Sequence, residues 1–374
     1  VHARHLAGFP LRLPALDVSA VGAGGGSIAW IDRDELLKVG PESAGADPGP
    51  ACYDKGGSVA TVTDANVLLG RLPSDALLDG RMPIRADLAK TAIDSLSAQL
   101  NLPIEDTALG IVQVASAVIV KAMRAISVER GHDPSAFTLF AYGGAGPLHA
   151  MEVAKELGIK KVFIPPNPGI LCAEGLLSSD LIADFVKPIL CRFDESVIQN
   201  ITLVWQDLNN QAVKWFQSED VSDENRKTTW VADLRYEGQN FELSIPFEFD
   251  KFGKSEIQQL RSAFDEAHEV AYGYAQPNEY VELVNIKVKL SGVLAKPSVP
   301  KLAVSVDAKP ISERKVCFQK GEWMETKVYR RLDVSRGKSL IGPAIIEQMD
   351  SIIVVFPGDI AKVDDWGNLL VNIS

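Results

Sequence analysis

Two successive segments with the pattern of a strand, a glycine-rich turn and a helix constrain the fold of this chain most strongly. Residues 137–142 are almost continuously apolar, as in a buried strand of a parallel sheet, and a glycine-rich turn at 143–146 leads into a helical segment at 151–157. Residues 160–164 repeat the strand, and a loop rich in Pro and Gly at 165–175 leads into another helical segment. Two such units in succession predict an α/β fold whose ligand site lies along the strand ends.

A second glycine-rich stretch lies near the start of the chain, between the apolar residues 16–21 and 28–31. Glycine has no Cβ, so such a loop can take left-handed backbone conformations and turn its N–H groups toward an anion. A hairpin turn without a ligand, or a tight strand-to-helix turn, is the alternative interpretation of such loops. The candidate phosphate or nucleoside contacts are Gly24, Gly25, Gly26 and Ser27 in the first loop and Gly143, Gly144 and Gly146 in the second.

Neither glycine run has the spacing of the dinucleotide fingerprint or of the P-loop, which ends in Gly-Lys-Ser/Thr. The helix that follows residues 143–146 still favours an anion, because its first N–H groups and its macrodipole point toward the turn. His149 falls within the first turn of that helix. We expect it to pack or to contact a nucleotide rather than to act as a catalytic base.

Residues 61–69 carry a helix-start signature, with Thr63 or Asp64 as the expected N-cap. Asp64 is either only a cap or also the ligand of a metal ion or of a phosphate-bound water at a strand-to-helix turn. Residues 40–53 form a long loop of small residues, Gly and Pro with no regular periodicity. Loops of this kind are usually functional or disordered, and the small residues favour an ordered loop shaped around a ligand.

The composition excludes several classes of function. The formal net charge of −11 argues against non-specific nucleic-acid binding, and no apolar run approaches the roughly 18 residues of a membrane span. The four cysteines have no CxxC spacing, which favours a reducing, cytoplasmic location over a zinc site or a disulfide framework. His2 and His5 lack a carboxylate partner in the sequence, so we expect surface residues rather than metal ligands.

The sequence divides into three parts. Residues 104–130 predict a helix that is apolar on most faces and is buried between layers of the first part. After residue 188, long amphipathic helices and alternating strands replace the glycine loops. We predict a core domain at 1–188, a mixed α+β region at 189–296 and a small β-rich module at 297–374, the last serving as scaffold more than as chemistry.

The ordered set of motifs resembles the hydantoinase A/5-oxoprolinase family over essentially the whole chain. The resemblance is carried by Val21-Gly22-Ala23-Gly24-Gly25-Gly26-Ser27-Ile28-Ala29, by residues 39–53, by Thr61-Val62-Thr63-Asp64-Ala65-Asn66, by residues 142–150, and by shorter matches at 235–239, 272–274 and 346–348. The order of these motifs is far more specific than any one of them.

This resemblance implies part of an actin-like ATPase domain of the ribonuclease H-like type. It also implies an ATP-dependent enzyme that opens hydantoin, 5-oxoproline or a lactam, or a relative that carboxylates ketones. ATP and Mg²⁺ would phosphorylate the amide or enolate oxygen and so create a good leaving group. By resemblance, Gly24, Gly25, Gly26 and Ser27 face the phosphates, Gly143, Gly144 and Gly146 face the nucleoside, and Asp64 orients Mg²⁺ or water.

The sequence departs from the family pattern in one respect, because the N-terminal domain with its Asp-Gly-Gly-Thr-type phosphate loop is absent. We therefore expect residues 1–374 alone to lack turnover and to need that domain and a B-type subunit or domain as partners. ATP-dependent hydrolysis of hydantoin or 5-oxoproline by the isolated chain would contradict this. A sugar-kinase-like or regulatory member of the actin-like superfamily and a non-catalytic interaction subunit remain as alternatives.

Overall fold

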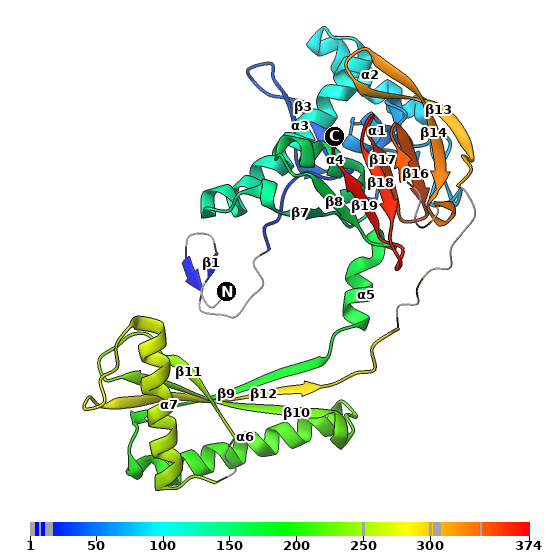
Figure 1. Cartoon of the computed structure of the whole chain (residues 1–374). Helices are drawn as coiled ribbons and strands as arrows, with labels where there is room; N and C mark the ends of the chain where they lie inside the picture. The colour runs from blue at the N-terminus through cyan, green and yellow to red at the C-terminus, as the bar shows by residue number, and fades with distance from the viewer. Residues whose placement is uncertain are drawn as a thin grey trace. The chain divides into compact units, whose positions relative to one another are not determined.

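The computed structural model describes residues 4–6, 9–11, 18–248, 251–298, 301, 308–334, 336 and 339–374, with side chains from residue 18 onward. They fold into two compact units (Figure 1). Unit 1 comprises Val1–Glu174 and Val299–Ser374, and unit 2 comprises Gly175–Ser298. The chain is thus a mixed α/β structure in which unit 2 is inserted between the two parts of unit 1.

The two βα units predicted from the sequence are present in unit 1. Strand β7 (Thr138–Phe140) precedes helix α4 (Gly146–Glu156), and β8 (Lys161–Ile164) precedes α5 (Leu171–Leu177). The strands β7 and β8 pair in parallel, as expected. The prediction of a buried first strand is wrong, because β7 is the edge strand of its sheet and Phe140 is 45% exposed.

Strands from the end of the chain complete this sheet. Strand β19 (Leu369–Asn372) pairs antiparallel with β8, which gives five strands in the order β15-β18-β19-β8-β7. The other two strands are β15 (Ser339–Ile341) and β18 (Ile360–Val363). The expected separate module at 297–374 is therefore wrong, since residues 299–374 belong to the same unit as the glycine loops, and β15, β18 and β19 belong to the same sheet as β7 and β8.

A second sheet of unit 1 has the order β13-β14-β16-β17. Its strands are β13 (Ser312–Gln319), β14 (Glu322–Arg330), β16 (Ala344–Gln348) and β17 (Ser351–Val355). All five residues of β17 are buried, and this strand packs against α4. Smaller antiparallel pairs are β1 (Arg4–Leu6) with β2 (Phe9–Leu11), β3 (Ser27–Ile31) with β4 (Leu37–Ser43), and β5 (Ala76–Leu77) with β6 (Met82–Pro83).

Helix α3 (Ile104–Ile126) packs against α1 (Val62–Leu68), α2 (Ala86–Leu100) and α4. With a mean hydropathy of 1.7 over its most apolar window, it has the length and composition of a membrane span, yet its first half lies in the core of unit 1. The helix is buried on most faces, as expected, only over this first half. Ile126, at the end of the helix, is 42% exposed.

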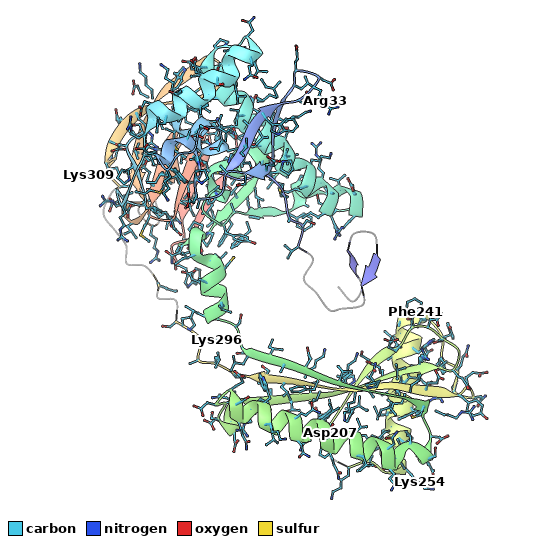
Figure 2. All side chains as sticks on the ribbon, turned by 180° about the vertical axis from the view of Figure 1, so that it is seen from behind. Arg33, Asp207, Phe241, Lys254, Lys296 and Lys309 are labelled. Atoms are coloured by element: carbon cyan, nitrogen blue, oxygen red, sulfur yellow. The ribbon has the colours of Figure 1, made fainter. Side chains whose placement is uncertain are left out.

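Unit 2 is a four-stranded antiparallel sheet with two helices. Its strands are β9 (Leu181–Arg192), β10 (Arg226–Tyr236), β11 (Leu243–Phe247) and β12 (Val281–Gly292), in the order β11-β10-β12-β9. Helix α6 (Ile198–Ser218) packs against β9 and β12, and α7 (Lys254–Tyr272) packs against β11. Figure 2 labels Asp207 on α6, which forms an ion pair with Lys187 of β9. The unit covers the predicted α+β region and adds residues 175–188, because β9 belongs to its sheet.

One buried arginine joins the parts of unit 1. The Arg71 side chain is fully buried and forms an ion pair of 3.0 Å with Glu152 of α4. Its other guanidinium nitrogens donate to the carbonyl oxygens of Cys317 and Phe318, in β13, at 3.2 and 3.3 Å. The residue before it, Gly70, approaches β13 so closely that a Cβ there would lie 2.1 Å from a backbone oxygen of that strand. Arg71 thus links the end of α1, the C-terminal strands and α4.

Removal of this arginine is expected to destabilise unit 1 strongly. The change Arg71→Ala leaves the Glu152 carboxylate, 15% exposed, without its cation and removes one hydrogen bond from each of the Cys317 and Phe318 carbonyl groups. We expect a loss of about 3–5 kcal/mol, the range for breaking a buried ion pair. Native-state hydrogen exchange of the backbone amides in α4 measures this loss of stability.

The matched control is Arg85→Ala, because Arg85 is half exposed and pairs with Asp87 at the surface. Exposed pairs of this kind contribute about 1 kcal/mol or less. Equal effects of the two substitutions would contradict the role given to Arg71.

Candidate functional site

The two glycine-rich loops lie against each other in unit 1. A Cβ on Gly25 would lie 3.9 Å from the Cβ of Ala145, in the second loop. The carbonyl oxygen of Gly25 accepts hydrogen bonds from the N–H and the hydroxyl of Thr63, at 2.8 and 2.9 Å. The first loop is therefore held at the start of α1 while it faces the second loop.

A cavity of about 270 Å³, the first cavity, opens beside the two loops. Its wall includes Gly25 and Gly26 from the first loop and Gly144 and Ala145 from the second. The small-residue loop at 40–53 contributes Gly45, Pro50 and Tyr53, in line with the expectation that this loop is shaped around a ligand site.

A cavity of about 200 Å³, the second cavity, lies on the other side of Ala145, which lines both cavities. Gly24 of the first loop and Gly146 of the second contribute to it. Its other lining residues are mostly apolar or aromatic, and they include Phe140 and Tyr142 at the end of β7. The glycine loops thus form the wall between two hollows.

The backbone of this wall carries hydrogen-bond donors without partners. The N–H groups of Gly25, Gly26, Gly144 and Ala145 have no acceptor among the residues that the structure describes. Converging N–H groups of this kind form an anion-binding concavity, and those of Gly144 and Ala145 lie directly before the first turn of α4, where the helix dipole adds to the effect. The arrangement can hold a phosphate or a developing oxyanion.

Two predicted contacts line neither cavity. The Ser27 side chain is buried, and its hydroxyl accepts from Gly24 N–H at 2.9 Å and donates to the Gly22 carbonyl at 3.4 Å. It closes the glycine turn from inside instead of facing a ligand. Gly143 takes a φ of +84° and donates its N–H to the Pro168 carbonyl at 2.6 Å, so it shapes the turn between β7 and α4.

Asp64 has a structural role. It is fully buried, and its two oxygens accept from the N–H groups of Ala51 and Cys52 and from the N–H and hydroxyl of Thr61, at 2.7–3.2 Å. Asp64 N–H in turn donates to the Thr61 hydroxyl, which completes a capping box at the start of α1. The N-cap is therefore Thr61, and the expectation of Thr63 or Asp64 as the N-cap is wrong. The prediction that Asp64 orients Mg²⁺ or water is not supported, because its oxygens are buried and serve the protein's own donors.

The described residues contain no group of three His, Cys, Asp or Glu side chains that could hold a metal ion. His2 lies outside the described residues, and the side chain of His5 is not described either. Cys52, next to Asp64, is not a nucleophile, because burial and then the Asp64 charge raise the pKa of its thiol far above neutrality.

The sequence analysis missed the turn between β16 and β17, which lines the first cavity through residues 348–351. Gln348 donates its side-chain N–H to the Pro166 carbonyl at 3.1 Å and to Asp350. Asp350 also accepts from Gly169 N–H at 2.7 Å. The available signal was the polar Glu-Gln-x-Asp-Ser sequence between two strongly apolar strands.

Two buried polar atoms of this turn have no partner among the described residues. They are Gln348 Oε1 and the hydroxyl oxygen of Ser351, whose side chain is 5% exposed. An unpaired buried polar atom costs about 1–3 kcal/mol, so its presence in a cavity wall points to a ligand or water that pairs with it.

His149 lines the second cavity from the first turn of α4 and is 3% exposed. Neither ring nitrogen has a hydrogen-bond partner within the described structure. Burial lowers the pKa of His149 to about 4, against an opposing effect of Glu152 and with a smaller contribution from Arg71. The ring is therefore neutral at pH 7 and packs, as expected, rather than taking up protons during catalysis.

The burial of neutral His149 predicts a pH-dependent stability. The unfolded chain binds a proton at this histidine near pH 6.5, but the folded chain does so only near pH 4. The free energy of unfolding that depends on the neutral His149 ring is fully present above pH 6.5. It falls by about 1.4 kcal/mol per pH unit as the pH decreases toward 4. In urea denaturation followed across this window, His149→Leu should remove that slope, whereas His132→Leu, at an exposed histidine, should keep it. An unchanged slope in His149→Leu would show that other groups cause it.

Comparison with known proteins identifies the chain's relatives. The model of the hydantoinase/oxoprolinase family matches residues 1–185, and that of the hydantoinase/oxoprolinase C-terminal domain matches residues 193–371. An uncharacterised protein of Methanocaldococcus jannaschii, MJ0964, is 41% identical over 99% of this chain and 53% of its own length. Caprolactamase subunit alpha of Pseudomonas jessenii is 36% identical over 94% of this chain and 51% of its own length. The 5-oxoprolinase 1 of Arabidopsis thaliana is 29% identical over 99% of this chain and 30% of its own length.

Two solved structures resemble the chain. The nucleotide-free structure of acetone carboxylase, described with the mechanism of ATP-dependent acetone carboxylation, has a TM-score of 0.91 at 24% identity and covers 99% of this chain and 54% of its own, which shows a shared fold. The ATP-dependent caprolactamase from Pseudomonas jessenii has a TM-score of 0.66 at 33% identity, and the match covers 97% of this chain and 53% of the caprolactamase chain. The chain spans about half the length of its most similar relatives or less. By both family models and these relatives, the chain belongs to the hydantoinase/oxoprolinase family.

Proposed function

We propose that this chain forms part of an ATP-dependent enzyme that opens a cyclic amide, and that unit 1 is part of an actin-like ATPase domain. The observation that carries the proposal is the wall of four unpartnered N–H groups, on Gly25, Gly26, Gly144 and Ala145, between two cavities. The similarity to caprolactamase subunit alpha and to 5-oxoprolinases supports an amide as the reacting group.

The two cavities suggest a division of roles. The second cavity, apolar and flanked by Phe140 and Tyr142, suits a nucleoside whose base stacks on an aromatic ring. The unpartnered N–H group of Ala145, which lines both cavities, suits the phosphates, and those of Gly25, Gly26 and Gly144 lie on the side of the first cavity. The phosphoryl group would then reach a substrate in the first cavity across the glycine wall.

The chemistry follows from the weakness of an amide as an electrophile. The amide oxygen of the substrate attacks the terminal phosphorus of ATP, and ADP leaves. Water then adds to the activated carbon, and the C–N bond of the ring breaks to give a free amine and an acyl phosphate. A second water hydrolyses the acyl phosphate to a carboxylate and inorganic phosphate. The chain's own contribution is to hold the reacting oxygen and the phosphoryl group at N–H donors that favour negative charge.

The described residues do not fit a protein-held Mg²⁺ site. They contain no group of three metal-ligating side chains, and the oxygens of Asp64 serve other donors. Any Mg²⁺ would take its ligands from phosphate oxygens and from groups outside the described residues.

Other parts of the proposal concern the whole protein. Because a caprolactamase relative is named as an alpha subunit, we propose that this chain also acts with a second, B-type subunit and with an N-terminal domain that bears another phosphate loop. A cytoplasmic location is supported by four free cysteines. No nucleic-acid or membrane partner is proposed.

A panel of substrates tests the reaction. ATP hydrolysis by the full-length protein with its B-type partner should rise with hydantoin, 5-oxoproline or a lactam and stay at its basal rate with sugars. Stimulation by a ketone with bicarbonate would instead favour the carboxylase alternative. No stimulation by any compound would favour a non-catalytic interaction subunit.

The substitution Gly146→Ala tests the nucleotide site without disturbing the fold. A Cβ at Gly146, the first residue of α4, would meet no atom within 4 Å, so the methyl group projects into open space at the second cavity. We expect nucleotide affinity, measured by calorimetry with a non-hydrolysable ATP analogue, to fall by about tenfold, equivalent to about 1.4 kcal/mol.

The control is Gly175→Ala, another helical glycine whose Cβ would meet no atom within 4 Å and which lines neither cavity. It should bind the analogue as the unsubstituted chain does. Unchanged affinity in Gly146→Ala would remove the second cavity from the proposed nucleotide site.

A further inference from the structure

We propose that the first cavity binds the ring amide itself and that it selects a neutral ring, such as a hydantoin or a lactam, over 5-oxoproline, which carries a carboxylate at neutral pH. This inference rests on the proposed function and narrows its substrate class. Four features of the cavity support it: its charge, its size, its polar groups and one strained residue in its wall.

The side-chain charge of the wall disfavours an anionic substrate, because the four N–H groups that favour negative charge serve the phosphoryl group and the reacting oxygen in the proposed function. Among the described residues that line the first cavity, Asp350 is the single charged side chain, and no lysine, arginine or histidine faces it. Gly169 N–H and the Gln348 side chain hold the Asp350 carboxylate in place. A substrate carboxylate would meet this like charge without a cation to offset it.

The size and the apolar walls suit one small ring. The volume of about 270 Å³ lies just below the usual range for small-molecule sites, about 300–1,000 Å³, and has room for a single small ring. Leu72, Leu77, Leu78 and Ile352 supply apolar surface for ring methylene groups. A neutral ring with one amide presents the matching surface, apolar around most of its edge.

The polar groups of the wall complement an amide. Both hydrogen-bond partners of Gln348 Nε2 are acceptors, which fixes the orientation of the side-chain amide and leaves Oε1 as an acceptor without a partner in the described chain. Because this oxygen has almost no accessible surface, the polar groups that a ring amide can reach are the backbone N–H groups of the glycine loops. The ring carbonyl can in turn accept from the N–H groups of Gly25 and Gly26.

The strained residue is Leu78, at the tip of the short β5–β6 hairpin. Leu78 and Asp79 have φ angles of +55° and +53°, which residues with a Cβ rarely adopt. Backbone strain of this kind clusters at functional sites. Leu78 lines the first cavity whereas Asp79 does not, so we infer that Leu78 limits the size of the ring.

A change of charge at Asp350 tests the selection of a neutral ring. Binding of hydantoin, ε-caprolactam and 5-oxoproline to the 374-residue chain is measured by ligand-observed NMR. The neutral rings should bind at least about tenfold more tightly than 5-oxoproline, and Asp350→Asn should reduce this ratio by about threefold or more. Asp79→Asn removes the same charge at an exposed residue outside the cavity and should leave the ratio unchanged.

The outcomes separate this inference from the proposed function. If 5-oxoproline binds as tightly as the neutral rings, or if the ratio does not respond to Asp350→Asn, the inference is wrong, while stimulation of ATP hydrolysis by cyclic amides would still support the proposed function. If no ring binds, the first cavity is not the amide site. If, in addition, no ring stimulates ATP hydrolysis, the proposed function also fails.

The hairpin offers a second pair of variants that should both fold. Leu78→Gly and Asp79→Gly each place glycine where the backbone is left-handed, which relieves strain. Only Leu78→Gly also opens the cavity wall, so it should shift the binding preference from the five-membered hydantoin toward the seven-membered caprolactam by about tenfold, roughly the value of one or two buried methylene groups. No shift, or an equal shift in Asp79→Gly, would overturn the role of Leu78.

Discussion

The buried guanidinium of Arg71 is the interaction on which the arrangement of unit 1 depends. Its planar fork reaches the Glu152 carboxylate on α4 and two consecutive carbonyl groups of β13, a set of acceptors that a lysine could not satisfy together. Because α4 begins at the second glycine loop, the fixed position of Glu152 also fixes that loop against the first one. The wall between the two cavities is thus positioned by a contact outside both of them.

The sequence was informative where local pattern determines structure, and less so where distant segments meet. The βα units and the glycine loops were predictable, because each depends on a strand, a turn and a helix that are adjacent in the chain. The pairing of β19 with β8 was not, since it joins residues about two hundred positions apart and leaves no local signature. For the same reason β7, apolar enough for a central strand, could not be recognised as an edge strand.

Asp64 and the β16–β17 turn show a similar limit for the site. A carboxylate at a helix start has the same sequence signature whether it caps or binds a metal. Here the deciding donors are the N–H groups of Ala51 and Cys52, thirteen and twelve residues away. Gln348 and Asp350 sit between apolar strands that predict scaffold, yet the fold places them in the wall of the first cavity. Local pattern indicated the type of element, left the role of Asp64 open between cap and metal ligand, and gave no role in the site to the β16–β17 turn.

The insertion of unit 2 between the two parts of unit 1 has a consequence for the order of events during synthesis. Every strand of unit 2 is synthesised before residues 299–374, so that unit can complete its sheet while unit 1 still lacks its last strands. The first cavity needs residues 348–352 for its wall, and the five-stranded sheet needs residues 369–372. The glycine loops therefore lack their contacts with the C-terminal strands until almost the whole chain has been synthesised. The first cavity can bind a ligand only after this late step of folding.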